Sequence, residues 1–580
     1  MFSHESNENC TLLLLKDNLI SFDTLFKMKK YRVYIFLGIL HIFLLWNTTG
    51  FAQNAVWQWS VLVKNAKENT GKARAFLWIP PDCKKVKAFL FAQNNMEEQS
   101  ILENQGFRKE MGKLGIAEVW VSPAYDLLFN FDKGAGETFN NIMNELAQVS
   151  GYSELNDVPF VGIGHSAAAS NPYYMAAWNP DRALATISVS GQWPYFRHVS
   201  FAPDIWGSRN IDYIPCLETM GEYEAADKWS TEGLKEKQAH PLMPLSMLAC
   251  PAEFHFATSD TKAVYIALYL KKVLQYRMPK NTPGDQAIKL IPVDPTKTGW
   301  LVDKWRFDQA PVAEPATVDQ YLGDRTQAFW YFDEELANAT AAYHARYRNQ
   351  KAQLIGYVQH GKLLEQRNVH QQFNLRFEPE ADGVTFKVHT AFYDTVPGGS
   401  PRPMGWAHMP VGLPIGHAIS DSPITVDRIT GPFVKINDST FRVHPQKGFY
   451  ESSHSYELWF SAGHPGNNEY KPAVQQALMT IPPRNTQGKE QHIAFSAISN
   501  QRPNKKGIKL KAASDAHVPV GFYVQDGPAE IIGDRLNLTA IPPRSKFPVK
   551  VTVIAWQYGN SNEPKLQTAE PVEHVFWINK

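Results

Sequence analysis

In the first half of the chain, short apolar runs alternate with segments in which apolar residues recur at helical spacing. The apolar runs predict strands over residues 56–63, 73–79, 86–92, 117–121, 158–163, 183–189, 213–220 and 244–250. Helical spacing predicts helices over residues 101–114, 137–149, 166–178 and 260–275. This order is typical of βαβ units, and parallel strands covered on both faces are expected to be apolar throughout. We therefore predict an α/β domain with a mostly parallel sheet over residues 53–280.

The pattern changes after this domain. Residues 281–325 are irregular and rich in proline, and residues 329–350 have a helical composition, so we predict a connector with one helix over residues 281–370. From about Phe373 onward, apolar and polar residues alternate with period two between turn residues. This pattern predicts two all-β domains, a β-sandwich over residues 371–490 and an immunoglobulin-like domain over residues 491–580.

Residues 1–52 predict an N-terminal extension with a secretory signal peptide over about 28–52. A basic segment, Met28–Arg32, precedes an apolar core, Val33–Trp46, and small residues stand at Gly50–Ala52. The apolar core is short for a membrane span. We therefore expect cleavage, a secreted or periplasmic protein, and no stable membrane span after cleavage.

Composition narrows the classes of partner and cofactor. The formal net charge of +1 does not indicate nucleic acid as a partner. Three of the four cysteines lie beyond the signal peptide, at Cys83, Cys216 and Cys250, which is too few for a disulfide framework and leaves a Cys216–Cys250 bridge open. No spacing of histidine and cysteine resembles a zinc site, so we expect no metal.

One stretch carries the chemistry, because the predicted strand 158–163 runs into Gly164-His165-Ser166-Ala167-Ala168 and then into a predicted helix. Strand, tight turn, serine and helix describe a nucleophile elbow, in which the serine hydroxyl is exposed at a sharp turn. An ordinary crossover with an incidental serine is the alternative. A histidine and an acid in positions to activate Ser166 would favour the nucleophile elbow over the ordinary crossover.

Both partners follow Ser166, with the acid before the histidine, which is the chain order found in hydrolases that carry such an elbow. His255 lies between the last predicted strand and the final helix, where its ring can reach Ser166. Glu224, three residues after the strand-ending Gly221, is the preferred acid, and Glu222 is the alternative. A solvated acidic turn and a structural histidine are the ordinary interpretations. His165, beside the serine, is expected to be packed or rim-forming.

The oxyanion of an acyl-transfer intermediate needs preorganised N–H donors. The backbone N–H of Ala167 is one candidate. The loop after the third strand supplies the other, at Asn94 or Asn95, by backbone or side chain.

With these motifs, residues 53–280 resemble a secreted α/β-hydrolase of the serine esterase kind, followed by β-sandwich and immunoglobulin-like domains. The resemblance rests on Gly164–Ala168, Gly221–Glu224 and Pro251–Phe256, and it covers under half of the chain. It implies a triad of serine, histidine and acid, without metal or organic cofactor. The sequence departs from the elbow pattern at Ala168, where the pattern has its last glycine.

The substrate is predicted less sharply than the mechanism. The aromatic segment 193–206, with Trp193 and Trp206, and residues 225–239 are expected to form a cap with a substrate rim. Export and appended β-domains favour a carbohydrate-linked or other polymer ester, and polysaccharide as a partner. Two alternatives stay open: a serine peptidase of the prolyl-peptidase type, and a catalytically silent carbohydrate-binding surface protein with platforms at Trp406 and Trp459.

Overall fold

The computed structural model describes residues 56–195, 206–280, 288–366, 373–419, 422–448 and 456–580. The predicted signal peptide lies outside these residues, as do residues 196–205 of the predicted cap. Within the described ranges, no helix combines the length and the apolarity that a membrane crossing demands. The cysteines at 83, 216 and 250 are free thiols and are buried, so the bridge between Cys216 and Cys250 is absent from the structure.

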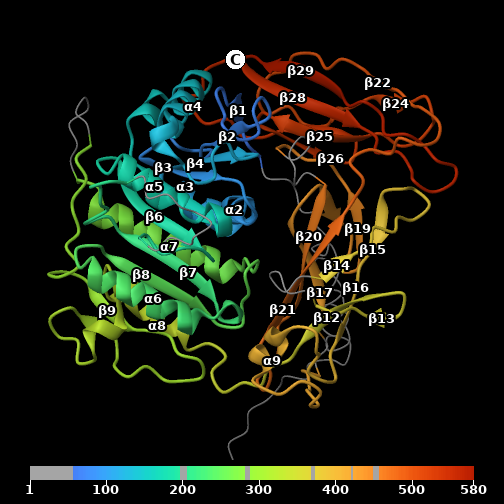
Figure 1. The fold of residues 1–580 in the computed structure, drawn as a ribbon. Coiled ribbons are helices and arrows are strands. Elements are labelled where there is room, and N and C mark those ends of the chain that lie inside the picture. The colour runs from blue at the N-terminus through green and yellow to red at the C-terminus, as the bar shows by residue number, and fades with distance from the viewer. Residues whose placement is uncertain (1–55, 196–205, 281–287, 367–372, 420–421, 449–455) are drawn as a thin grey trace, which may run out of the picture. The chain divides into compact units, whose positions relative to one another are not determined.

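An eight-stranded sheet forms the centre of the first domain (Figure 1). Its strand order is β1-β2-β4-β3-β5-β6-β7-β8. Strands β1 and β2 are antiparallel to their neighbours, and the strands from β3 to β8 are parallel to one another. The strands are Trp59–Leu62, Arg74–Trp78, Ala88–Gln93, Ile116–Ser122, Phe160–His165, Ala183–Val189, Cys216–Gly221 and Leu245–Cys250. This mostly parallel sheet confirms the predicted α/β class of the first domain.

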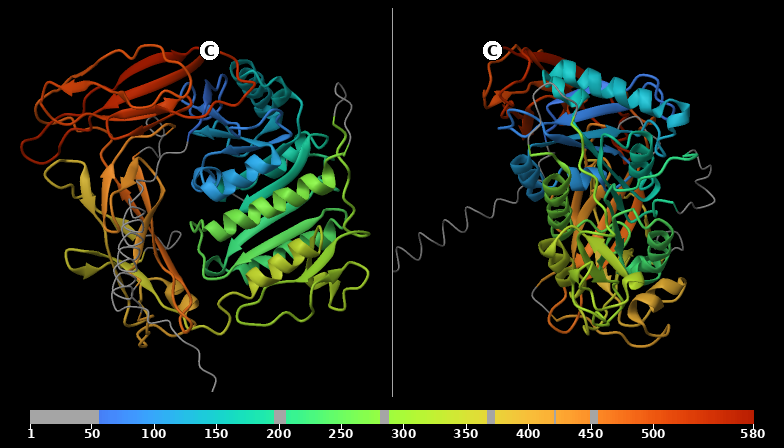
Figure 2. Two further views of the ribbon diagram at one scale, coloured as in Figure 1. Left: turned by 180° about the vertical axis from the view of Figure 1, so that it is seen from behind. Right: turned by 90° about the vertical axis from the view of Figure 1, so that its left-hand side faces the viewer.

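Helices cover both faces of this sheet (Figure 2). They are α2 (Glu98–Leu102), α3 (Gln105–Leu114), α4 (Ala135–Ser150), α5 (Asn171–Trp178), α6 (Ala226–Ala239) and α7 (Asp260–Arg277). The predicted helix 101–114 divides at Asn104, whose side chain accepts the N–H of Phe107 at 2.9 Å and so begins α3 as an N-cap. The predicted helix 166–178 begins with the 3-10 turn Ser166–Ala168.

Residues 226–239 of the predicted cap form helix α6, a crossover between two strands of the sheet, which corrects the sequence interpretation. Helix α6 packs against β7 and β8 as the crossover between these two parallel strands. Its small residue Gly233 lies against the ring of Trp193, where a Cβ would approach the ring within 2.3 Å. The polar composition that suggested a cap belongs to the exposed face of this helix.

The connector packs onto the α/β domain. Strands β9 (Trp300–Asp303), β10 (Ala316–Thr317) and β11 (Ala328–Tyr331) form a small sheet, followed by α8 (Glu334–His344). The predicted helix 329–350 is therefore too long, because its first residues are a strand. Trp330 and Tyr331 are buried in the same core as the eight-stranded sheet, so the connector extends that core.

The remaining chain consists of small sheets, in agreement with the predicted all-β class. The first region holds β12 (Ile355–Gln359), β13 (Lys362–Leu363), β14 (Phe373–Leu375), β15 (Thr385–Lys387), β16 (His389–Phe392), β17 (Thr425–Thr430), β18 (Phe433–Lys435), β19 (Thr440–Val443), β20 (Glu457–His464) and β21 (Ala473–Thr480). One helix that the period-two pattern does not predict, α9 (Pro401–Ala407), interrupts them.

The C-terminal region is likewise built from short strands, arranged in three sheets. They are β22 (Ile493–Phe495), β23 (Ile508–Lys509), β24 (Ala512–Ser514), β25 (Gly521–Asp526), β26 (Ala529–Ile532), β27 (Arg535–Leu538), β28 (Val549–Trp556) and β29 (Val572–Ile578). These strands enclose a separate apolar core that includes Leu536, Val551 and Phe576. The immunoglobulin-like topology of this region stays a prediction.

Candidate active site

Ser166 stands directly after β5, at the carboxyl end of the parallel sheet. Its φ of +54° lies in the left-handed region, which non-glycine residues seldom adopt outside constrained sites. The turn also needs a glycine at position 164, because a Cβ there would lie 2.1 Å from the carbonyl oxygen of Ala168. A strained serine on a tight strand-to-helix turn presents its hydroxyl outward.

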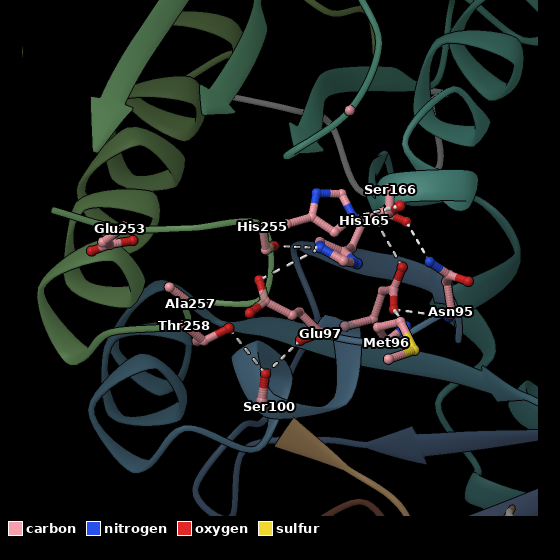
Figure 3. Close-up of polar contacts among 12 residues, drawn as sticks. Asn95, Met96, Glu97, Ser100, His165, Ser166, Glu253, His255, Ala257 and Thr258 are labelled. Atoms are coloured by element: carbon pink, nitrogen blue, oxygen red, sulfur yellow. Dashed lines mark hydrogen bonds and ion pairs between the residues drawn. The ribbon is translucent and has the colours of Figure 1, made fainter. Parts of the chain in front are cut away.

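His255 reaches Ser166 from the loop between β8 and α7. Its Nε2 lies 2.8 Å from the Oγ of Ser166, and the side chain is buried (Figure 3). The backbone just before it is constrained, since Ala252 has a φ of +59°. The structure therefore brings together the serine and the histidine that the sequence singled out.

Glu224 lies on the other side of the same imidazole, in the 3-10 turn Glu222–Glu224 that follows β7. Its Oε1 is 2.5 Å from Nδ1 of His255, and its side chain is 13% exposed. Because a carboxylate only accepts hydrogen bonds, its place beside Nδ1 favours the tautomer with the proton on Nδ1, which leaves Nε2 to accept the proton of Ser166. This is the tautomer that a general base toward Ser166 requires.

Glu222, the alternative acid, is directed elsewhere. Its carboxylate pairs with the ammonium of Lys471 and accepts the backbone N–H of Ala252 at 2.8 Å. Geometry therefore places Glu224, and not Glu222, against His255.

The backbone donors predicted in the loop after β3 are already engaged. The N–H of Asn94 donates to the carbonyl of Val121 at 2.8 Å, and the N–H of Asn95 donates to the carboxylate of Glu98 at 2.8 Å. The side-chain amide of Asn95 lies beside Ser166 and donates to the carbonyl of His165 at 3.1 Å (Figure 3). Ala167 stands in the first turn after β5, where N–H groups have no intrahelical acceptor. Of the predicted donors, the N–H of Ala167 and the side-chain amide of Asn95 therefore remain as candidates for the oxyanion hole.

Glu98 belongs to the site, although the sequence interpretation did not include it. The carboxylate accepts the N–H groups of Asn95 and Met96 at 2.8 Å each, and that of His165 at 2.7 Å. The side chain is fully buried, and burial raises its pKa to about 7. Glu98 is the first residue of α2, so these contacts are not those of a capping box, and no motif in the sequence signalled them.

His165 is packed beneath the site, in agreement with one of its two predicted roles. Its ring lies 4.8 Å from the ring of His255, and its Nε2 donates to the carbonyl of His255 at 2.9 Å. The buried carboxylate of Glu97 lies 3.9 Å from the same nitrogen. Burial raises the pKa of Glu97 to about 7, against the opposing effect of Lys262. His165 therefore holds the backbone of His255 and does not compete with it for the serine.

The two tryptophans expected to form a substrate rim lie in the core, which corrects that expectation. Trp193 is fully buried, stacks on Phe329 at 5.8 Å and donates its N–H to the carbonyl of Trp229. Trp206 is 2% exposed and packs edge-on against Tyr174. Large aromatic residues in such a segment are compatible with a substrate rim and with a hydrophobic core. Here both tryptophans belong to the hydrophobic core.

The residues named as sugar platforms are also buried. Trp406 is 6% exposed and Trp459 is 8% exposed. Trp406 packs on Phe254, and Trp459 packs on Phe256, so both support the loop that carries His255.

A cavity of about 710 Å³ lies beside Glu224. Its walls come from the turn after β7, from the connector at Trp305 and Phe307, and from α9 at Arg402 and Trp406. Across the described ranges, no three histidine, cysteine, aspartate or glutamate side chains gather as a metal site would need.

Comparison with known proteins adds little beyond this geometry. No protein-family model matches the chain, and no curated protein matches it. Among solved structures, it is similar to a dienelactone hydrolase from Anabaena variabilis, with 14% identity, a TM-score of 0.26, and coverage of 38% of this chain and 96% of that one. Est1E from Butyrivibrio proteoclasticus has 14% identity, a TM-score of 0.25, and coverage of 37% and 99%.

An S-formylglutathione hydrolase from Agrobacterium tumefaciens has 12% identity, a TM-score of 0.29, and coverage of 38% and 97%. At identities and TM-scores of this size, no activity carries over from these proteins to this chain.

Proposed function

We propose that the protein is a serine hydrolase that cleaves carboxylic esters through an acyl-enzyme. The observation that carries the proposal is the chain of contacts from Ser166 through His255 to Glu224, at 2.8 Å and 2.5 Å. A strained serine hydrogen-bonded to a histidine that a carboxylate orients is the arrangement that activates a hydroxyl nucleophile.

In the first half of the proposed reaction, His255 Nε2 takes the proton of Ser166 while Oγ attacks the ester carbonyl carbon. The imidazolium that forms is stabilised by Glu224, which keeps its negative charge. The tetrahedral oxyanion accepts hydrogen bonds from the N–H of Ala167 and from the amide of Asn95. When the carbonyl re-forms, the alcohol leaves with the proton of Nε2, and the acyl group stays on Oγ.

In the second half, water takes the place of the alcohol. His255 Nε2 accepts one proton of the water while the oxygen attacks the acyl carbon. Collapse of the second tetrahedral intermediate breaks the bond to Oγ, and Nε2 returns the proton to Ser166. The products are one carboxylic acid and one alcohol, and the enzyme is unchanged.

For the substrate, we propose a carbohydrate-linked or other polymer ester outside the cytoplasm. The predicted signal peptide and the appended β-regions support this class. The prolyl-peptidase type of activity and a silent carbohydrate-binding protein are the alternatives. The burial of Trp406 and Trp459 weighs against the binding protein, because flat sugar contacts need exposed rings.

The test is hydrolysis of short p-nitrophenyl esters by residues 53–580, beside the hydrolysis of prolyl anilides. We expect ester turnover that falls to the background rate in Ser166→Ala. Anilide release without ester cleavage would favour the peptidase. Retention on polysaccharide with no turnover of either substrate would favour the binding protein.

A further inference from the structure

The turn that carries Glu224 is held by residues from the β-region that follows the connector. Lys471, just before β21, forms an ion pair with Glu222, and these side chains are 3% and 7% exposed. The backbone carbonyl of Lys471 in turn accepts the side-chain amide of Gln353 at 2.9 Å. A buried ion pair is costly to break by removing one partner, because the other charge is then left unpaired. The pair therefore ties this turn firmly to the β-region.

A second contact comes from α9. The indole N–H of Trp406 donates to the carbonyl of Tyr223 at 2.9 Å, and the two rings lie 5.0 Å apart. The hydroxyl of Tyr223 donates to the carbonyl of Pro472 at 3.2 Å. Each residue of the turn before Glu224 is thus bonded to the β-region.

The same residues reach the loop that carries His255. Glu222 accepts the N–H of Ala252, and the N–H of Tyr223 donates to the carbonyl of Glu253 at 3.0 Å. The ring of Trp406 lies 5.0 Å from that of Phe254, next to His255. One set of contacts from the β-region therefore fixes both loops whose side chains must meet.

We infer that Lys471 and Trp406 are positioning residues of the proposed hydrolase, and that the β-region is an integral part of its acid–histidine geometry. This inference rests on the proposed function. The two residues touch neither Ser166 nor His255, and act by holding the turn Glu222–Glu224 against the loop 252–255. A carboxylate displaced by about 1 Å no longer orients the imidazole, and misplacement of that size costs on the order of 100-fold in rate.

The experiment compares Lys471→Met and Trp406→Phe with wild-type protein in kcat and KM for a short p-nitrophenyl ester, per mole of folded protein. Because a short ester has no distant group to bind, we expect KM to stay nearly constant. We expect kcat to fall on the order of 10- to 100-fold in Lys471→Met. The fall should be smaller in Trp406→Phe, which loses the indole N–H to the carbonyl of Tyr223 but keeps an aromatic ring. The matched control is Lys351→Met, which removes an exposed ion pair with Glu469 in the same region.

Lys471→Met leaves Glu222 as a lone buried charge, so a second variant separates positioning from folding. The double variant Glu222→Gln with Lys471→Met has no lone charge, and its glutamine oxygen can still accept the N–H of Ala252. A kcat that stays low in the folded double variant supports the inference. A kcat restored to the wild-type value overturns it, as does a wild-type kcat in both folded single variants. If wild-type protein turns over no ester while it remains folded, the proposed function fails, and the inference fails with it.

Discussion

The carboxylate of Glu98 joins the loop after β3 to the strand that ends at the candidate nucleophile, through the N–H of His165 at 2.7 Å. The same side chain accepts the N–H groups of Asn95 and Met96. All three backbone N–H groups need a hydrogen-bond acceptor, and the two carboxylate oxygens of Glu98 are those acceptors. Glu98 thus sets the distance between the Asn95 amide and Ser166.

From this relationship we expect Glu98→Gln to lower kcat on the order of 10- to 100-fold, with a smaller change in KM. In glutamine, an NH₂ group replaces one of the two carboxylate oxygens. A hydrogen-bond donor then faces a backbone N–H, which is also a donor. Steady-state kinetics on a p-nitrophenyl ester checks this. Glu110→Gln, an exposed glutamate on α3, is the control and is expected to match wild type. A Glu98→Gln enzyme with wild-type kcat would mean that the loop is held by other contacts.

A second prediction separates the two acids after β7. Glu224→Gln is expected to lower kcat by about 10⁴-fold, because an amide can present its N–H to Nδ1 and so favour the wrong tautomer of His255. Glu222→Gln keeps an acceptor for Ala252 and is expected to lose less activity. Measuring kcat of the two folded variants ranks the acids. A larger loss in Glu222→Gln would reverse the assignment.

A third prediction concerns the oxyanion donor. Asn95→Ala is expected to lower kcat by about 10²- to 10³-fold, the usual effect of removing one such donor. Asn94→Ala is the natural comparison, since the Asn94 side chain accepts the indole N–H of Trp120 and does not face Ser166. Equal kinetic losses in both variants would place the donor elsewhere.

A fourth prediction concerns stability and pH through Glu97, whose pKa is about 7 in the folded protein against 4.5 ordinarily. Between these two values the native state holds a proton that the unfolded chain has released. The free energy of unfolding therefore falls as pH rises from about 4.5 to about 7, and stays low above that. Over this pH range, the Glu97 carboxyl lowers the free energy of unfolding by an amount on the order of 3 kcal/mol.

Glu97→Gln removes that contribution, so the urea midpoint should fall less between pH 5 and pH 8 than in wild type. Part of the dependence will persist, because burial also raises the pKa of Glu98 to about 7 and that of Glu118 to about 8. The exposed residue Glu137 provides the control substitution to glutamine. An unchanged difference between the two midpoints in Glu97→Gln would contradict the prediction.

The sequence predicted those parts of the site that depend on chain order. The hydrophobic periodicity and the order of the predicted strands place Ser166, Glu224 and His255 at the same edge of a parallel sheet, because each of them follows a strand of that sheet. The sequence preferred Glu224 over Glu222 by its position after Gly221, but it did not show the partner that holds Glu222 away from His255, because Lys471 lies 249 positions further along the chain. Such long-range pairs leave no local pattern.

The predictions from sequence were wrong at segments whose amino-acid composition is compatible with two different structures. Trp193 is aromatic in a segment that looks like a cap, yet Gly233 on α6 lets that helix approach and bury the ring. Residues 329–350 contain many alanines, but Phe329 to Tyr331 pair with β9 and form a strand. Tertiary packing decided both cases, and it is not visible in periodicity.

The most direct test of the account is covalent labelling of the protein with a fluorophosphonate, followed by peptide mass spectrometry. An activated serine is expected to bond to phosphorus with loss of fluoride, so one label should appear on the peptide that contains Ser166. Labelling should vanish in Ser166→Ala, slow strongly in His255→Ala, and stay unchanged in Ser499→Ala, an exposed serine far along the chain. A label that persists in Ser166→Ala, or folded wild-type protein that takes up none, would contradict the assignment of Ser166 as the nucleophile.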